Sequence, residues 1–128
     1  MNNVVLDASA VLALIGGERG HESLSETVLE NAVCSTVNLS EVQAKLVSRG
    51  WTPDEAWEDA TGPIREAIPF SDQHAKVAGS LITLTQPLGL SLGDRSCLAL
   101  GILLRAPIYT AEKSWTKLKI NVPIHVIR

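Results

Sequence analysis

Four carboxylates lie either directly after a short apolar segment or near the start of an apolar segment with helical spacing. They are Asp7 in VVLDASAVLAL, Glu41 in VNLSEV, Asp94 in SLGDRS and Glu112 in YTAEKSW. A carboxylate can accept a proton or bind a hard divalent cation, so several at one place would make an acid–base or metal site. Such chemistry requires that the fold bring the four positions together.

The segments around these acids alternate between predicted strands and predicted helices. Strands are expected at VVL, AVCSTV, REAIPF, APIYT and PIHVIR. Helices are expected at ASAVLALI, 21–31, NLSEVQAKLVSRG, TPDEAWEDA, SDQHAKVAGSLITL and 92–104, with a short turn at KSWTKL. This order predicts an α/β fold, with a mainly parallel sheet of four to five strands between two helical layers, in a single domain over residues 1–128. The carboxyl ends of parallel strands lie at one edge, where ligands of such folds bind.

Several helices carry more specific signals. Thr52 precedes Pro53 and stands three residues before Glu55, which predicts a capped helix start. The segment 92–104 is apolar nearly all round, which predicts a central, buried helix. In SDQHAKVAGSLITL the apolar face is expected to consist of Val77, Ala78, Leu81 and Ile82.

A purely structural role is available for three of the acids. The spacings from Asn38 to Glu41 and from Ser91 to Asp94 match the capping box, in which an acid bonds back to the residue that caps the helix. Asp7 can also cap a helix, although its neighbours on both sides are apolar and would place it at a partly dry edge. Each acid taken alone is therefore open to both interpretations.

The four acids together favour a metal site. Converging carboxylates without matched Arg or Lys repel one another, and a hard cation among them relieves that repulsion. Oxygen ligands favour Mg²⁺ or Mn²⁺ over zinc. Such clusters hydrolyse phosphodiesters, because the metal generates hydroxide and stabilises the charge that develops on phosphate. Glu112, taken alone, is better interpreted as an ordinary solvated acid.

Composition sets outer limits on the class of protein. The chain has 128 residues, 45% hydrophobic and 20% charged, as in a folded globular domain. A net charge of −3 argues against binding nucleic acid through bulk positive charge. If four acids surround a cation, however, the rest of the chain is nearly neutral. The longest apolar run, CLALGILL, is too short to cross a bilayer, and two cysteines make no disulfide framework, so a cytoplasmic location without membrane contact is expected.

The order VVLDASAVLAL, VNLSEV, LSLGDRSCLAL, YTAEKSW resembles the PIN-domain ribonucleases, and within them the VapC-type toxins of toxin–antitoxin pairs. The resemblance covers essentially the whole chain. It implies a three-layer α/β/α PIN-like domain and a metal-dependent endoribonuclease that uses Mg²⁺, for which Mn²⁺ can substitute. A metal-activated water would attack phosphorus in line and leave a 3′-hydroxyl and a 5′-phosphate. The implied partners are an RNA substrate, a cognate antitoxin and a second copy of the chain in a homodimer.

The resemblance also assigns roles by position. Asp7 and Asp94 correspond to metal ligands, and Glu41 to an acid that acts on the metal directly or through water. Glu112 stands where the family most often has Asp, so its carboxylate lies one methylene further from the backbone. Small polar residues near the family's site correspond to Ser9, Asn38 and Thr110.

Three alternatives remain open. A catalytically degenerate PIN domain would bind RNA or protein and would differ from the nuclease by lacking metal dependence. A phosphatase of the haloacid-dehalogenase type also places an Asp after its first strand, but it needs a second acid two residues on, where this chain has Ser9. A receiver domain would need an acidic pair before its first helix and a lone Asp after a middle strand, and neither is evident.

Overall fold

A five-stranded sheet forms the centre of the protein. The computed structural model describes residues 2–128. The strands are β1 (Val4–Leu6), β2 (Ala32–Ser35), β3 (Glu66–Ile68), β4 (Ile108–Thr110) and β5 (Ile124–Val126). Their spatial order is β3-β2-β1-β4-β5, and every neighbouring pair is parallel. The predicted parallel sheet is therefore confirmed, with β1 at its centre.

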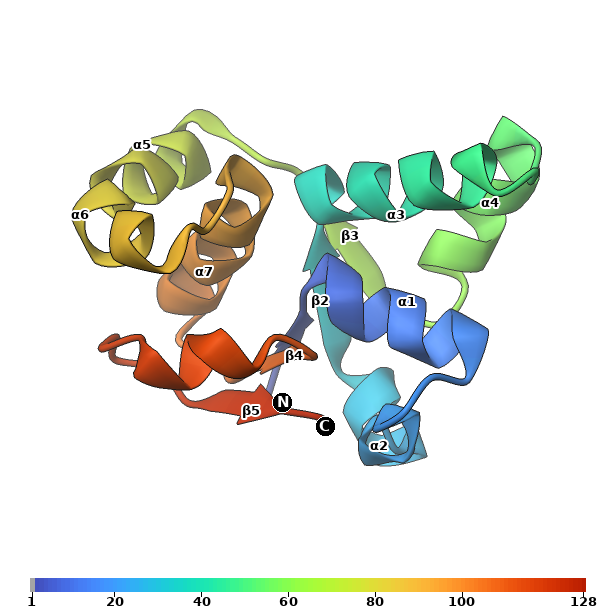
Figure 1. The fold of residues 1–128 in the computed structure, drawn as a ribbon, viewed down its shortest axis with the longest axis horizontal. Coiled ribbons are helices and arrows are strands. Elements are labelled where there is room, and N and C mark those ends of the chain that lie inside the picture. Colours follow the sequence, from blue (N-terminus) through green and yellow to red (C-terminus); the bar gives the residue numbers. More distant parts are fainter. Residues whose placement is uncertain (1) are drawn as a thin grey trace.

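Helices cover both faces of this sheet (Figure 1). The helical segments are α1 (Ala8–Gly16), η1 (His21–Ser23), α2 (Glu26–Glu30), α3 (Thr36–Ser48), α4 (Pro53–Thr61), α5 (Asp72–Ser80), α6 (Ile82–Thr85), η2 (Gln86–Leu88), α7 (Leu92–Leu104) and η3 (Lys113–Lys117). Helices α1 to α4 lie on one side of the sheet, and α5, α6 and α7 lie on the other. This arrangement is the predicted three-layer α/β/α architecture.

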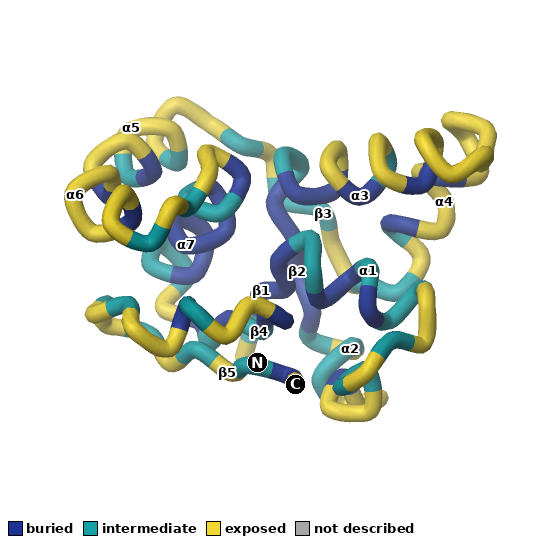
Figure 2. Tube along the Cα trace, viewed as in Figure 1, coloured by how far each residue is buried: buried dark blue, intermediate teal, exposed yellow. Residues whose placement is uncertain are grey.

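Two apolar cores separated by the sheet explain why the first strand is so apolar. Val5 belongs to the core that contains Leu98 and Trp115, whereas Leu6 belongs to the core that contains Val11 and Leu39. Successive side chains of a strand point to opposite faces, so Val5 and Leu6 serve opposite cores, and Val4 packs on the same side as Leu6. Figure 2 shows the buried trace running through the strands and the inner faces of the helices.

Local capping chemistry sets several helix ends as predicted. Thr52 Oγ1 accepts the Glu55 N–H at 3.2 Å, and Glu55 Oε1 accepts the Thr52 N–H at 3.0 Å, which completes the capping box of α4. Gly17 ends α1 in the left-handed region, at φ 60°, where glycine is favoured. The predicted helix 92–104 has the bounds of α7, although Leu92 at its start is 54% exposed.

The single helix predicted for residues 21–31 is wrong. The segment forms the 3-10 turn η1 and then the short helix α2. Ser25 adopts an extended conformation and its Oγ accepts the Val28 N–H at 3.3 Å, so it caps a new helix where a continuous one would need helical backbone.

The prediction that the second strand extends through AVCSTV is also wrong at its end. Ser35 is the N-cap of α3, with its Oγ accepting the Val37 N–H at 3.2 Å, so 36–37 belong to the helix. The capping box proposed from Asn38 to Glu41 does not exist, because Asn38 lies inside the first turns of α3. Capping residues can start a helix inside an apolar run, which strand periodicity does not reveal.

The helix predicted over SDQHAKVAGSLITL divides at Leu81 into α5 and α6. Ser80 Oγ donates to the Val77 carbonyl at 2.6 Å and competes for a backbone acceptor at the end of α5. Ala78 and Leu81 are buried as predicted, but Ile82 is 41% exposed. Ile82 therefore does not belong to the buried face on which it was expected.

Within residues 2–128, none of the helices combines the length and apolar character needed to span a bilayer.

Candidate active site

An acidic cleft of about 220 Å³ opens where the strands end. The residues that line it are Asp7, Ala8, Ser9, Leu12, Glu41, Lys45, Asp94 and Glu112. Asp7 follows β1, Glu112 follows β4, Glu41 lies on the helix after β2, and Asp94 lies in the first turn of α7. The structure thus brings together all four carboxylates that the sequence singled out, from segments far apart in the chain.

Asp7 is the most enclosed of these acids, with an exposed fraction of 3%. Its Oδ1 accepts the Ala10 N–H at 2.8 Å, which makes Asp7 the N-cap of α1. The Ser9 hydroxyl donates to the same carboxylate at 2.8 Å, and the Thr110 hydroxyl donates to Oδ2 at 2.7 Å. The capping role and a place in the cleft are therefore compatible, because one carboxylate serves both.

The two hydroxyls also fix the backbone opposite Asp7. Ser9 Oγ accepts the Ala111 N–H at 2.9 Å, and Thr110 Oγ1 accepts the Glu112 N–H at 3.0 Å. The segment after β4 is consequently tied to the start of α1. Ser9 and Thr110, predicted only as supporting residues, thus lie in direct contact with Asp7.

Burial raises the pKa of Asp7 from 3.8 to about 6. The hydrogen bonds from Thr110, Ala10 and Ser9 act in the opposite direction because they stabilise the charged form, and the negative charge of Asp94 adds to the increase. The pKa of Asp7 therefore lies only a little below neutral pH, so a modest fall in pH protonates this carboxylate.

Glu41 lies against the first turn of α7. Its Oε1 accepts from Asn38 Nδ2 at 3.0 Å, and the same Nδ2 donates to the Gly93 carbonyl at 2.9 Å. Partial burial raises the pKa of Glu41, the Asn38 hydrogen bond lowers it, and the charge of Asp94 raises it further. The residue that the sequence suggested as a helix cap, Asn38, instead bridges α3 and α7 while 1% exposed.

Asp94 and Glu112 complete the acidic wall in different ways. Asp94 Oδ2 accepts the Ser91 N–H at 2.9 Å, and Ser91 Oγ accepts the Asp94 N–H at 3.2 Å, so the predicted capping box of α7 is present. Glu112 stands at the N-cap position of η3, but its side chain makes no cap hydrogen bond there. Asp94 is thus fixed by the capping box that it forms with Ser91, whereas the Glu112 carboxylate is not tied by such a bond.

The donor set suits a hard divalent cation. Ion pairs within residues 2–128 join His21 to Glu22, Arg65 to Glu66 and Arg128 to Glu18, so no cleft acid has a salt-bridge partner in the described chain. All candidate ligands are oxygens, which is the chemistry that Mg²⁺ prefers. As the side chains are placed, no three His, Cys, Asp or Glu residues of 2–128 form a ready ligand group. The fit therefore rests on donor chemistry and uncompensated charge.

Sequence reasoning missed two residues at this site. Lys45 is the one cationic residue in the cleft lining, and its position one helical turn after Glu41 was the available signal. Gly93 packs directly beneath the Glu41 carboxylate. The sequence offered one signal for Gly93, its position next to Asp94. The contact itself joins α7 to α3, so no local pattern predicts it.

The two cysteines do not offer a nucleophile. Cys34 and Cys97 are free and fully buried. Burial raises the pKa of both thiols, and the charges of Asp7 and Glu41 raise them further, so both stay protonated at neutral pH.

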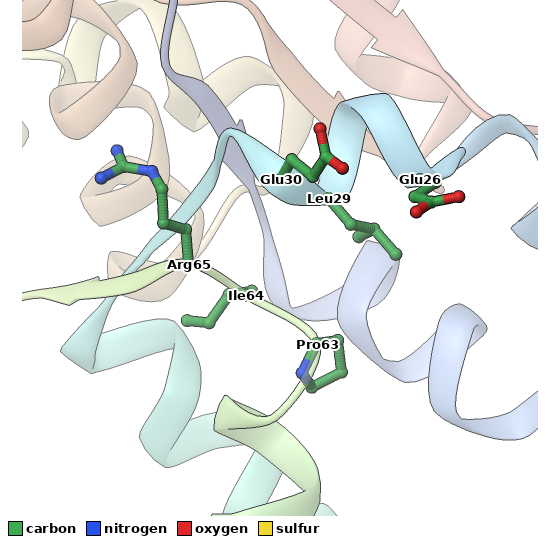
Figure 3. A pocket seen from close by; sticks show the side chains of 6 residues that line it. All are labelled: Glu26, Leu29, Glu30, Pro63, Ile64 and Arg65. Atoms are coloured by element: carbon green, nitrogen blue, oxygen red, sulfur yellow. The ribbon is translucent and has the colours of Figure 1, made fainter.

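A second, larger cavity of about 540 Å³ shares no lining residue with the acidic cleft. It lies between α2 and the segment before β3 and is lined by Glu26, Leu29, Glu30, Pro63, Ile64 and Arg65 (Figure 3). Arg65 pairs with Glu66 at 3.3 Å, and the wall between the charged groups is apolar. Its size exceeds that of the acidic cleft, but it lacks converging catalytic groups, so the acidic cleft is the better candidate.

Comparisons with known proteins agree with this architecture. The sequence model of the PIN domain matches residues 4–121. Among proteins with curated functions, none matches the chain.

Solved structures with the same fold include toxin–antitoxin complexes. VapBC2 from Rickettsia felis, bound to a promoter DNA fragment, is 19% identical with a TM-score of 0.70, over 94% of this chain and 96% of that chain. A toxin–antitoxin complex from Klebsiella pneumoniae is 19% identical with a TM-score of 0.70, over 95% and 100%. DNA-bound VapBC from Salmonella typhimurium is 12% identical with a TM-score of 0.74, over 97% of each chain. At these identities the likeness is one of fold. Because the family match spans most of the chain, including all four cleft acids, the chain belongs to the PIN-domain family.

Proposed function

We propose that this PIN domain is a metal-dependent endoribonuclease that acts as the toxin of a toxin–antitoxin pair. The observation that carries the proposal is the convergence of four carboxylates in one cleft without a salt-bridge partner among the described residues. Such uncompensated charge is costly unless a cation is bound there in the working state. Family membership displaces the phosphatase and receiver alternatives.

Asp7 and Asp94 would hold a Mg²⁺ ion, and Glu41 would contact it directly or through water. Glu112 would contribute further negative charge to the cleft. When bound, Mg²⁺ lowers the pKa of water and stabilises the negative charge that develops on phosphate. The carboxylates supply only oxygen ligands, which favour binding of Mg²⁺ over binding of zinc.

The chain's own residues would orient the reacting groups. Asp7 is held by three donors, from Ser9, Ala10 and Thr110, so its carboxylate keeps one orientation. Glu41 Oε1 is occupied by Asn38, and Oε2 is the atom we assign to take the proton from the attacking water. The water oxygen would bond to phosphorus while the bond to the 3′ oxygen breaks. The 3′ oxygen would take a proton from solvent and leave as the 3′-hydroxyl, and the other product would be a 5′-phosphate.

Lys45 would bind RNA rather than an acid of the cleft. It lines the cleft, yet within the described chain no carboxylate lies within salt-bridge distance of its ammonium. A phosphate next to the one being cleaved would give this charge a partner, as Lys and Arg do in most contacts with nucleic-acid backbones.

The proposed partner is an antitoxin that covers the cleft. The proposal is supported by solved structures with this fold, which include VapBC complexes and FitAB bound to DNA. A homodimer is proposed on the family resemblance. Co-expression with the product of an adjoining short gene, followed by size-exclusion chromatography with light scattering, tests both assemblies.

A catalytically degenerate binding module is the second candidate. It is favoured by one observation, the lack of a preformed three-ligand group among residues 2–128. Purified antitoxin-free protein should cleave a structured RNA in Mg²⁺ or Mn²⁺ and lose this activity in EDTA. Cleavage that persists in EDTA would refute the metal mechanism, and RNA binding without cleavage in either metal would favour the binding module.

A further inference from the structure

The Glu41 carboxylate is held by a contact between two helices. Asn38, one turn earlier on α3, donates through Nδ2 to Glu41 Oε1 at 3.0 Å and to the Gly93 carbonyl of α7 at 2.9 Å. Asn38 is 1% exposed, so packing fixes the orientation of its amide. The position of the carboxylate is therefore set by α7 as well as by the helix that carries it.

Gly93 provides the space that this carboxylate occupies. A Cβ at position 93 would lie 2.5 Å from Glu41 Cδ and closer still to both carboxylate oxygens. The three heavy atoms nearest to such a Cβ all belong to this carboxylate. Gly93 lies in the first turn of α7, where exposed backbone N–H groups favour a nearby negative charge. Any side chain here would displace the Glu41 carboxylate from its present position.

The energetics of Asn38 point away from a purely structural role. Its Oδ1 is buried and has no hydrogen-bond partner within the described residues. An unsatisfied buried polar atom costs on the order of 1–3 kcal/mol, so an apolar residue of similar size would serve a core better. The two hydrogen bonds that Asn38 Nδ2 donates offset this cost, and one of them is accepted by Glu41, an acid of the cleft.

We propose that Asn38 and Gly93 form a seat for the Glu41 carboxylate, and that the seat positions this acid for metal binding and proton transfer. Asn38 and Gly93 are positioning residues, since both act through Glu41. The proposal rests on the proposed nuclease function for its consequence, but the seat itself can be tested without catalysis. Its central requirement is that position 93 carry no side chain.

Gly93→Ala is the direct test, and Gly79→Ala is its matched control. Gly79 is a helical glycine of α5, and a Cβ added there would meet nothing within 4 Å, so its substitution should change nothing at the cleft. Alanine is the better helix former, so Gly93→Ala should fold, with Glu41 swinging aside at its flexible end. Asn38→Leu, which keeps the number of side-chain heavy atoms, removes the donor and serves as the second variant.

Mn²⁺ affinity, measured by calorimetry, reports on the seat independently of turnover. We expect Gly93→Ala to weaken Mn²⁺ binding about 10- to 100-fold, the usual effect of losing a group that orients a ligand. In a Glu41→Ala background the same substitution should have no further effect, because the residue it displaces is gone. Unchanged affinity in Gly93→Ala, or an equal further loss in the double variant, overturns the proposal.

The side-chain amide resonance of Asn38 separates failure of the seat from failure of the function. If the wild-type chain binds no Mn²⁺ and cleaves no RNA, the proposed function is wrong. The seat is then judged by this resonance, which should shift in Gly93→Ala and stay in place in Gly79→Ala. An Asn38 amide that is insensitive to Gly93→Ala means that the seat does not hold Glu41.

Discussion

Thr110 Oγ1 donates a 2.7 Å hydrogen bond to Asp7 Oδ2, and so joins the ends of two neighbouring strands, β1 and β4. The same Thr110 oxygen accepts the Glu112 N–H at 3.0 Å. The Thr110 hydroxyl thus orients the Asp7 carboxylate and also fixes the backbone of Glu112.

Thr110→Val should impair both stability and cleavage. Valine matches the shape of threonine but leaves the Glu112 N–H and Asp7 Oδ2 without this partner, at a cost of about 1–3 kcal/mol of unfolding free energy. The pKa of Asp7 should rise further, because a hydrogen bond that favours its charged form is lost. Urea unfolding and the pH dependence of cleavage measure the two effects. Thr110→Ser keeps the hydroxyl and should restore most of both; equal damage by Ser and Val would contradict this role.

Asp7→Asn should abolish cleavage while stabilising the metal-free fold at neutral pH. The folded-state pKa of Asp7 is about 6, above its ordinary value of 3.8, so the folded state holds its proton more tightly than the unfolded state. The stability associated with that proton is fully present below about pH 4 and is lost as the pH rises through 6. Removing the charge should recover up to about 3 kcal/mol of unfolding free energy at pH 7.

The comparison of wild type and Asp7→Asn at two pH values provides the control. Denaturant unfolding in EDTA should give a higher free energy of unfolding for Asp7→Asn than for wild type at pH 7. At about pH 4, where the wild-type carboxyl is already protonated, the two values should differ little. A variant less stable than wild type at pH 7 would mean that Asp7 acts mainly as a charged helix cap.

Mg²⁺ should raise the melting temperature of the wild-type chain, and more so at higher pH. A ligand that binds only the folded state stabilises it, and Mg²⁺ needs the charged form of Asp7. Because the pKa of Asp7 is about 6, the thermal shift should be large at pH 8 and small at pH 5. Differential scanning fluorimetry measures it. Asp7→Asn should show little shift at either pH, and a pH-independent shift in the wild type would place the ion elsewhere.

Lys45→Ala should weaken RNA binding without removing metal dependence. The loss of one phosphate contact should raise KM more than it lowers kcat and should reduce the slope of log affinity against log salt by about one. Lys45→Arg should retain the salt slope. Lys76→Ala on α5, outside the cleft lining, is the matched control. A fall in kcat with unchanged KM would instead assign Lys45 to the reaction itself.

Sequence patterns predicted the fold well where a local signal decided the outcome. The VVL strand, the Thr52 capping box and the bounds of α7 depend on neighbouring residues, and all three are confirmed. The errors came from competition between local signals. Ser25 and Ser35 cap helices inside segments whose apolar pattern indicated uninterrupted elements, and pattern alone does not tell which signal prevails.

The sequence predicted those residues of the candidate site that lie next to the ends of predicted strands or the starts of predicted helices. Asp7 and Asp94 were located from their place beside predicted elements, and the structure puts them in one cleft. Asn38 was placed near the site, but its role as a bridge from α3 to the Gly93 carbonyl was not predictable. That contact spans 55 residues and depends on how two helices approach, which no spacing in the sequence records.

The shell of hydrogen bonds around Asp7 has a consequence for protein synthesis. Asp7 leaves the ribosome before its Thr110 donor and before Glu112, which both follow α7 in the chain. Until β4 pairs with β1, the cleft lacks Glu112, and Asp7 lacks its Thr110 donor. A nascent chain therefore cannot form the complete cleft until the residues that follow α7 have been synthesised.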